Sequence, residues 1–195
     1  MIREDRQRRE EAQQCYRPDQ LRCIFIAEAP PNDPERYFYF PDVIKHDDLF
    51  RGVIKAIYPD VSLSRDKHAK HKLLCKFKAD GYYLIDLCLD PLEGTDAEKR
   101  DRRLEAVQGL VDRLHEMRSE HLPIIIIKCP VYDLIYCRLC KDGFIYTCNE
   151  RIEFPGSGQQ SKFRKHFSDA LAWQRRLFPV QTNDAHDAMT HLPAP

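Results

Sequence analysis

Short, uninterrupted apolar runs recur along the chain and predict the strands of a sheet. Residues 23–27 form the first run, and residues 82–89, 123–128 and 144–148 form three more. A run of this length without polar alternation is typical of a strand that is covered on both faces, as in a parallel sheet. The third run gives the clearest signal, because four isoleucines follow one another and β-branched side chains favour strands. These runs predict a mainly parallel sheet of roughly four strands.

Segments with apolar residues at helical spacing lie between the predicted strands. Residues 48–58 are apolar at 49, 50, 53, 54 and 57, which is one face of a helix. Strands that alternate with helices predict an α/β fold, here a three-layer α/β/α sandwich. The helices are predicted at residues 48–58, 64–78, 97–118, 130–140 and 161–177.

Two of these helices carry clear start signals. Asp47 or Asp48 is placed to cap the first of them. Thr95 and Glu98 have the spacing of a capping box at the start of the long helix over residues 97–118. These signals support the predicted boundaries.

The length of the chain, 195 residues, predicts one domain. We assign residues 20–178 to this domain. Residues 1–19 are expected to form a polar N-terminal arm with a loose helix over residues 1–14, and residues 179–195 a disordered tail.

Charge and composition narrow the possible partners. Lysine and arginine together number 31, as do aspartate and glutamate, so no overall field draws the protein to nucleic acid or to an anionic membrane. Contact with DNA would therefore depend on local basic patches. No apolar run reaches the roughly 20 residues of a membrane span, and the charged N-terminus lacks a signal-peptide core. We expect no membrane association; the sequence indicates no oligomeric state.

The eight cysteines favour a reducing, cytoplasmic location over a disulfide-linked structure. Cys23 and Cys88 lie inside apolar runs and Cys129 follows one, as buried free thiols do. Cys137, Cys140 and Cys148 offer three thiols for a metal and no obvious fourth ligand, which leaves zinc or iron–sulfur binding as an alternative to ordinary thiols. We expect no metal and no cofactor.

Glu28 is the first candidate for chemistry. It ends the run over residues 23–27 and precedes Ala29, Pro30 and Pro31, whose prolines stiffen the turn. In open α/β sheets, ligands bind beyond the carboxyl ends of the strands. A carboxylate at this point can orient or deprotonate water. The alternative is a glutamate that caps the following turn.

Further candidates lie in an aromatic segment and at the end of the second strand. Residues 37–40 are four consecutive aromatics in a loop, placed either to stack on a base or to pack over the sheet edge. Asp86 ends the second predicted strand and either reads a ligand, caps a turn or pairs with Lys128 or Arg138.

Two basic segments are candidate phosphate contacts. The predicted helix over residues 64–78 has the strongest local basic face, which is either a phosphate contact or a solvated surface. The glycine-rich loop over residues 154–158 leads into a helix whose first turns carry Lys162, Arg164 and Lys165. Backbone N–H groups at a helix start bind phosphate. The alternative for this loop is a plain connector.

The order of these segments resembles the uracil-DNA glycosylase superfamily, over about residues 20 to 178. Ala27-Glu28-Ala29-Pro30-Pro31 is similar to the Gly-Glu-Ala-Pro-Gly water-positioning motif of the iron–sulfur branch. Tyr37, Phe38 and Tyr39 lie in the region of the aromatic that stacks on the flipped base, and Asp86 stands where the family has a uracil-reading asparagine. The loop over residues 154–158 matches the place of a His-Pro-Ser-type loop that inserts into DNA.

The sequence also departs from this family. Phe154 replaces the histidine that stabilises the departing base, and no Cys-x2-Cys precedes the first strand. An ionised Asp86 only accepts hydrogen bonds, whereas asparagine also donates them. An aspartate would suit an exocyclic amino group, such as that of cytosine.

The resemblance implies a uracil-DNA glycosylase-like fold and hydrolysis of the N-glycosidic bond of a damaged or deaminated base in DNA, as in base-excision repair. It implies Glu28 as the catalytic residue. The implied substrate-binding residues are Ala27, Ala29, Pro30, Tyr37, Phe38, Tyr39 and Asp86. The implied DNA-binding residues are Phe154, Pro155, Gly156, Ser157, Gly158, Gln159, Lys162, Arg164 and Lys165. The alternatives are an inactive member of the fold that binds nucleic acid, a nucleotide or a protein partner, and a hydrolase of free bases or nucleosides.

Overall fold

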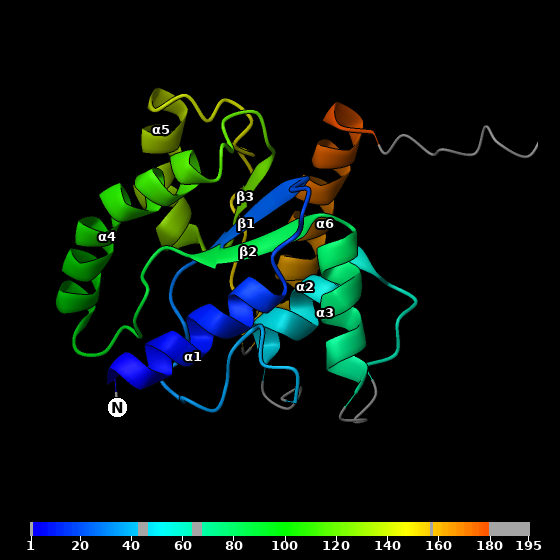
Figure 1. The fold of residues 1–195 in the computed structure, drawn as a ribbon. Helices are drawn as coiled ribbons and strands as arrows, with labels where there is room; N and C mark the ends of the chain where they lie inside the picture. Colours follow the sequence, from blue (N-terminus) through cyan, green and yellow to red (C-terminus); the bar gives the residue numbers. More distant parts are fainter. Residues whose placement is uncertain (1, 43–46, 64–67, 157, 180–195) are drawn as a thin grey trace, which may run out of the picture.

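A three-stranded, all-parallel sheet forms the centre of the protein (Figure 1). The computed structural model describes residues 2–42, 47–63, 68–156 and 158–179. Strand β1 (Cys23–Ala27) lies between β2 (Tyr82–Asp86) and β3 (Ile124–Ile126). Every residue of the three strands is buried, which explains why their sequences are continuously apolar up to Asp86.

Six helices accompany the sheet in the described part of the chain, and the α/β class is as predicted. In Figure 1, α4 and α5 lie on one side of the sheet, and α2, α3 and α6 lie on the other. Phe25 of β1 contacts the second group, with ring centroids 5.9 Å from Phe77 of α3 and 5.2 Å from Phe167 of α6. The helices are α1 (Ile2–Cys15), α2 (Asp48–Ile57), α3 (Ala69–Ala79), α4 (Asp96–Glu116), α5 (Cys129–Lys141) and α6 (Gln160–Leu177).

The predicted fourth strand at residues 144–148 is present only as an isolated parallel bridge between Thr147 and Ile124. The N–H of Ile124 donates to the carbonyl of Tyr146 at 2.9 Å. The segment turns sharply, because the N–H of Thr147 and its hydroxyl both donate to the carbonyl of Phe144. The turn keeps the segment from running alongside β3, so the regular sheet has three strands rather than four.

The helix starts follow the signals in the sequence. Asp47, not Asp48, caps α2 by accepting a hydrogen bond from the N–H of Phe50 at 3.1 Å. The capping box of α4 is complete: the Glu98 carboxylate accepts from the N–H of Thr95 at 2.7 Å, and the N–H of Glu98 donates to the Thr95 hydroxyl. These two caps confirm the predicted starts.

Helix α1 packs against the end of β2 and the segment that follows it. Arg9 is 6 % exposed and donates to the carbonyl of Leu89 and to Asp90. Gln13 donates to the carbonyl of Leu84 at 2.9 Å. The N-terminal helix therefore forms one wall around the carboxyl end of β2.

Several predictions fall on residues outside the described ranges. They are the start of the predicted helix at residues 64–67, Ser157, and the tail from residue 180 onward. Among the helices that the structure describes, none is long and apolar enough to cross a membrane.

Candidate functional site

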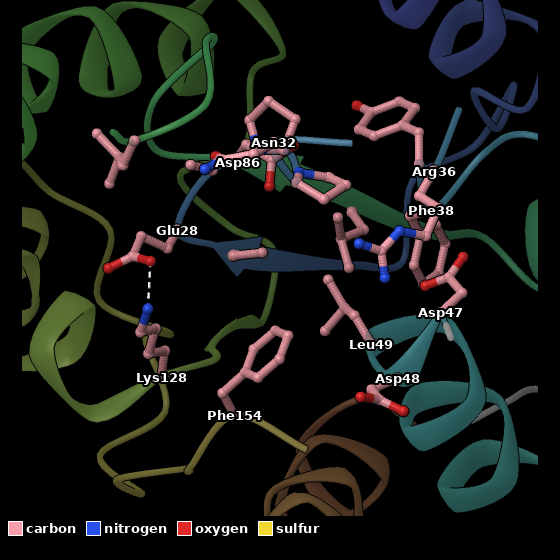
Figure 2. Close-up of a pocket in the computed structure, with 17 residues that line it drawn as sticks. Glu28, Asn32, Arg36, Phe38, Asp47, Asp48, Leu49, Asp86, Lys128 and Phe154 are labelled. Atoms are coloured by element: carbon pink, nitrogen blue, oxygen red, sulfur yellow. Dashed lines mark hydrogen bonds and ion pairs between the residues drawn. The ribbon is translucent and has the colours of Figure 1, made fainter. Parts of the chain in front are cut away.

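A cavity of about 340 Å³ opens at the carboxyl edge of the sheet (Figure 2). Glu28 follows β1, Asp86 is the last residue of β2, and Lys128 stands two residues after β3; all three line the cavity. Because parallel strands point in one direction, their carboxyl ends meet at one edge of the sheet, where ligands of open α/β sheets bind.

Most of the predicted substrate-binding residues line this cavity. Segments far apart in the sequence meet here: the turn after β1, the aromatic loop, the end of β2 and the loop before α6. The predicted residues that line the cavity are Ala27, Glu28, Ala29, Pro30, Tyr37, Phe38, Asp86 and Phe154.

Tyr39 does not line the cavity. It is fully buried, and its hydroxyl accepts from the N–H of Leu84 at 2.7 Å and donates to the carbonyl of the same residue at 3.0 Å. Its ring stacks on Tyr16 of the segment after α1, with centroids 6.0 Å apart. Tyr39 therefore belongs to the core that joins α1 to β2.

The other described residues among the predicted DNA-binding residues do not line the cavity. Pro155 is buried, Gly156 is half-buried, and Gly158 and Gln159 are exposed on the approach to α6. Lys162, Arg164 and Lys165 are exposed on α6 itself.

Glu28 is held between two cations. Its carboxylate accepts from Arg103 of α4 at 2.9 Å through one oxygen and from the Lys128 ammonium through the other. The side chain is 16 % exposed, so one side still faces the cavity. Backbone pairing also extends beyond β1, because the N–H of Cys88 donates to the carbonyl of Glu28 at 2.9 Å. These side-chain partners argue against the alternative that Glu28 caps the following turn.

Lys128 occupies an unusual backbone conformation, with φ 84° and ψ 114°. Its N–H donates to the carbonyl of Ile152, and its own carbonyl accepts from the N–H of Val131, so β3 passes into α5 without a loop. Positive φ is costly for a residue with a Cβ, and such strain concentrates at functional sites. The sequence hypotheses missed Lys128 as a site residue; its position directly after the isoleucine run was the available signal.

Asp86 is a buried carboxyl group with several charged neighbours. It is 6 % exposed and accepts a hydrogen bond from Tyr37. Burial raises the pKa of Asp86 to about 7; Arg113 and Arg9 oppose this rise, and Glu28 adds to it. Lys128 pairs with Glu28 and Arg138 with Asp142, so neither is the partner considered for Asp86. Near neutral pH the group is thus present in both its protonated and its ionised form.

A buried lysine supports the aromatic wall of the cavity. Lys70 of α3 is fully buried and donates to Asp47 at 2.7 Å and to the carbonyl of Tyr37 at 3.0 Å. Burial lowers the pKa of Lys70, and Asp47 opposes that effect. The ammonium also lies 4.7 Å from the ring centroid of Phe50. The predicted basic face of this helix therefore contributes one of its lysines to the core.

No group of three or more His, Cys, Asp or Glu side chains with metal-binding geometry occurs among the described residues. Cys23, Cys88 and Cys148 are buried and Cys129 and Cys140 half-buried, all as free thiols.

Comparisons with protein-family models, curated proteins and solved structures find no match to this chain. A functional assignment must therefore start from the geometry of the cavity.

The raised pKa of Asp86 predicts a pH-dependent stability. An acid whose pKa is higher in the folded than in the unfolded state stabilises the fold while it is protonated. For Asp86, this stabilisation is complete below the pKa of the unfolded state, near 3.8, and is lost as the pH rises through about 7. Relative to Asp86→Asn, the free energy of unfolding of the wild type should therefore fall between these values by on the order of 4 kcal/mol. Urea denaturation across a pH series measures the difference, and a constant difference would contradict the burial argument.

The backbone of Lys128 predicts an unusual ranking of two variants. Lys128→Ala and Lys128→Gly both remove the ammonium, and only the alanine keeps a Cβ at positive φ. We expect the glycine variant to be more stable than the alanine variant by about 1 kcal/mol. Chemical denaturation of both variants measures this; an alanine variant of equal or greater stability would show that the position is not strained.

Proposed function

We propose that the protein is a uracil-DNA glycosylase-like hydrolase that cleaves the N-glycosidic bond of a deaminated base in DNA, in the manner of base-excision repair. One observation carries the proposal: Glu28, Tyr37, Phe38 and Asp86 share one cavity at the carboxyl edge of a parallel sheet. Its volume of about 340 Å³ suits a small ligand such as a nucleobase. The proposal includes a uracil-DNA glycosylase-like fold with DNA as the partner.

An extruded base would enter between aromatic walls. Enzymes that act on a base in a duplex first take it out of the stack and hold it against aromatic side chains. Tyr37 and Phe38 supply buried walls, whereas Phe154 is 40 % exposed and presents more ring surface to a ligand. Asp86 supplies the polar group in this cavity that reads the base edge.

Glu28 would position the water. Its carboxylate accepts a hydrogen bond from the water as the bond between the sugar C1′ and the base nitrogen breaks, with the electron pair leaving on the base. The water oxygen then bonds to C1′, and its proton is released through the carboxylate. The negative charge also stabilises the positive charge that develops on the sugar.

Lys128 fits the role of the absent histidine. Its ammonium lies 6.0 Å from the ring centroid of Phe154, the residue that stands in the place of that histidine. An ammonium has three donors, and one of them binds Glu28. The remaining donors would stabilise the negative charge of the departing base.

A protein that binds DNA or nucleotides without hydrolysis is the second candidate. It is favoured by the pairing of Glu28, since each carboxylate oxygen already has a cationic partner. Base release therefore has to be measured directly.

Replacement of Glu28 separates the two candidates. Glu28→Gln should lower base release at least about 100-fold, because the amide no longer carries the charge or accepts the proton. Gel detection of abasic sites in duplexes that contain uracil, xanthine or hypoxanthine measures this. Glu116→Gln, at an exposed position on α4, is the matched control and should retain full activity. Absence of release from every duplex by the wild type would favour the binding protein.

The ionisation of Asp86 predicts how activity depends on pH and on the base. Protonated Asp86 donates from its hydroxyl and accepts at its carbonyl, as an amide does, which suits the N–H and carbonyl of uracil or hypoxanthine. Because burial raises the pKa of Asp86 to about 7, release of these bases should decline as the pH rises through that value. Asp86→Asn should remove this decline in single-turnover rates. A decline of equal size in both proteins would assign it to another group.

A further inference from the structure

A second hollow, of about 180 Å³, lies between α2 and α6, and we call it the α2–α6 groove. Arg51 and Lys55 of α2 and Arg164 of α6 line it. Of these three cations, only Arg164 is among the predicted DNA-binding residues. The groove thus brings together three cations from segments more than a hundred residues apart.

These cations have no partners in the described structure. Arg51, Lys55 and Arg164 are exposed and make no ion pair or side-chain hydrogen bond with any described residue. Elsewhere on the surface, exposed arginines do pair: Arg8 with Glu35 and Arg151 with Asp133. Three unpaired cations beside one carboxylate, Asp48, leave the groove with a net positive charge, so it is suited to an anionic ligand.

The start of α6 adds backbone donors to the same place. Gln160, the first residue of the helix, lines the groove, and the N-cap residue Gln159 makes no side-chain capping bond. The first N–H groups of a helix have no partner within it and carry partial positive charge. Together with the guanidinium groups of Arg51 and Arg164, they match the chemistry of a phosphate.

The groove continues from the cavity. Asp48 lines both, and the chain passes from Phe154 in the cavity wall to Pro155 in the groove wall. Figure 2 shows Asp48 and Phe154 on the side of the cavity where α2 approaches α6. Gly52 allows the close approach of the two helices, because a Cβ there would lie 2.9 Å from Cε1 of Phe163 on α6.

We infer that the α2–α6 groove binds the sugar–phosphate backbone of the DNA strand whose base enters the cavity. This inference rests on the proposed function and adds the path of the strand. Arg51, Lys55 and Arg164 contact phosphates, and the start of α6 supplies N–H donors. Asp48 repels phosphate at the end of the groove that adjoins the cavity. The extruded nucleotide therefore leaves the path of the backbone at this point.

The test is the salt dependence of DNA binding. Fluorescence anisotropy with a labelled duplex that contains uracil yields the slope of log K against log salt concentration. Each phosphate contact contributes about 0.9 to that slope, so the triple variant R51Q/K55Q/R164Q should lose about 2.7 of it. The matched control R100Q/K141Q/R176Q removes the same charge from exposed positions on α4, on α5 and near the end of α6 that line neither the cavity nor the groove, and it should lose less than about 1.

The outcomes distinguish a failure of the proposed binding groove from a failure of the proposed hydrolysis. A loss confined to the groove variant supports the inference, provided that thermal unfolding shows both triple variants folded. Equal losses in both variants, no loss in either, or no binding by the wild type would overturn it. Wild-type binding that depends on the groove without any base release would leave the groove standing and refute the proposed hydrolysis.

Discussion

The parallel pairing of β1 with its two neighbours is the constraint on which the site depends. Ala27 lies opposite Asp86 in one pairing, and Ile26 lies opposite Ile126 in the other. This register sets Glu28, Asp86 and Lys128 at one edge. Because a strand advances about 3.3 Å per residue, a slip of β2 by two residues would carry Asp86 roughly 6–7 Å away from Glu28. The cavity therefore exists only in this register.

Charge balance is the second constraint, and it links elements across the site. Glu28, directly after β1, pairs with Arg103 of α4, and Asp47 at the start of α2 pairs with Lys70 of α3. Such pairs contribute little net stability, but removal of one partner leaves a charge without compensation. These ion pairs thus hold the carboxylates of Glu28 and Asp47 at fixed positions beside the cavity.

Much of this architecture follows from local patterns in the sequence. The apolar runs predicted all three strands, and Asp47 and Thr95 predicted helix starts. The abrupt change from the first apolar run to a charged residue identified Glu28 as a site candidate. These features depend on neighbours in the chain, so periodicity and capping chemistry reveal them. The order of the segments also placed Tyr37 and Asp86 in one cavity with Glu28.

Other features depend on packing between distant elements and had no local signal. Lys70 lies in a basic segment whose composition is typical of a solvent-exposed helix face, yet residues that are distant in the sequence pack around it and bury it. The pairing of Arg103 with Glu28 spans 75 positions, and no motif marks it. The segment at residues 144–148 is apolar enough for a strand, but the turn at Phe144 leaves it a single bridge. The burial that raises the pKa of Asp86 likewise has no local signal, and the two arginines that oppose the rise, Arg9 and Arg113, come from α1 and α4.

The ammonium of Lys70 also connects two segments that are distant in the sequence. It ties the carbonyl of Tyr37 to the residue that caps α2, across 33 and 23 positions of the chain. The aromatic wall and the first turn of α2 are thus both anchored on α3. An outward displacement of the wall would strain the contact that Lys70 also makes with the start of α2, the helix that carries Arg51 and Lys55.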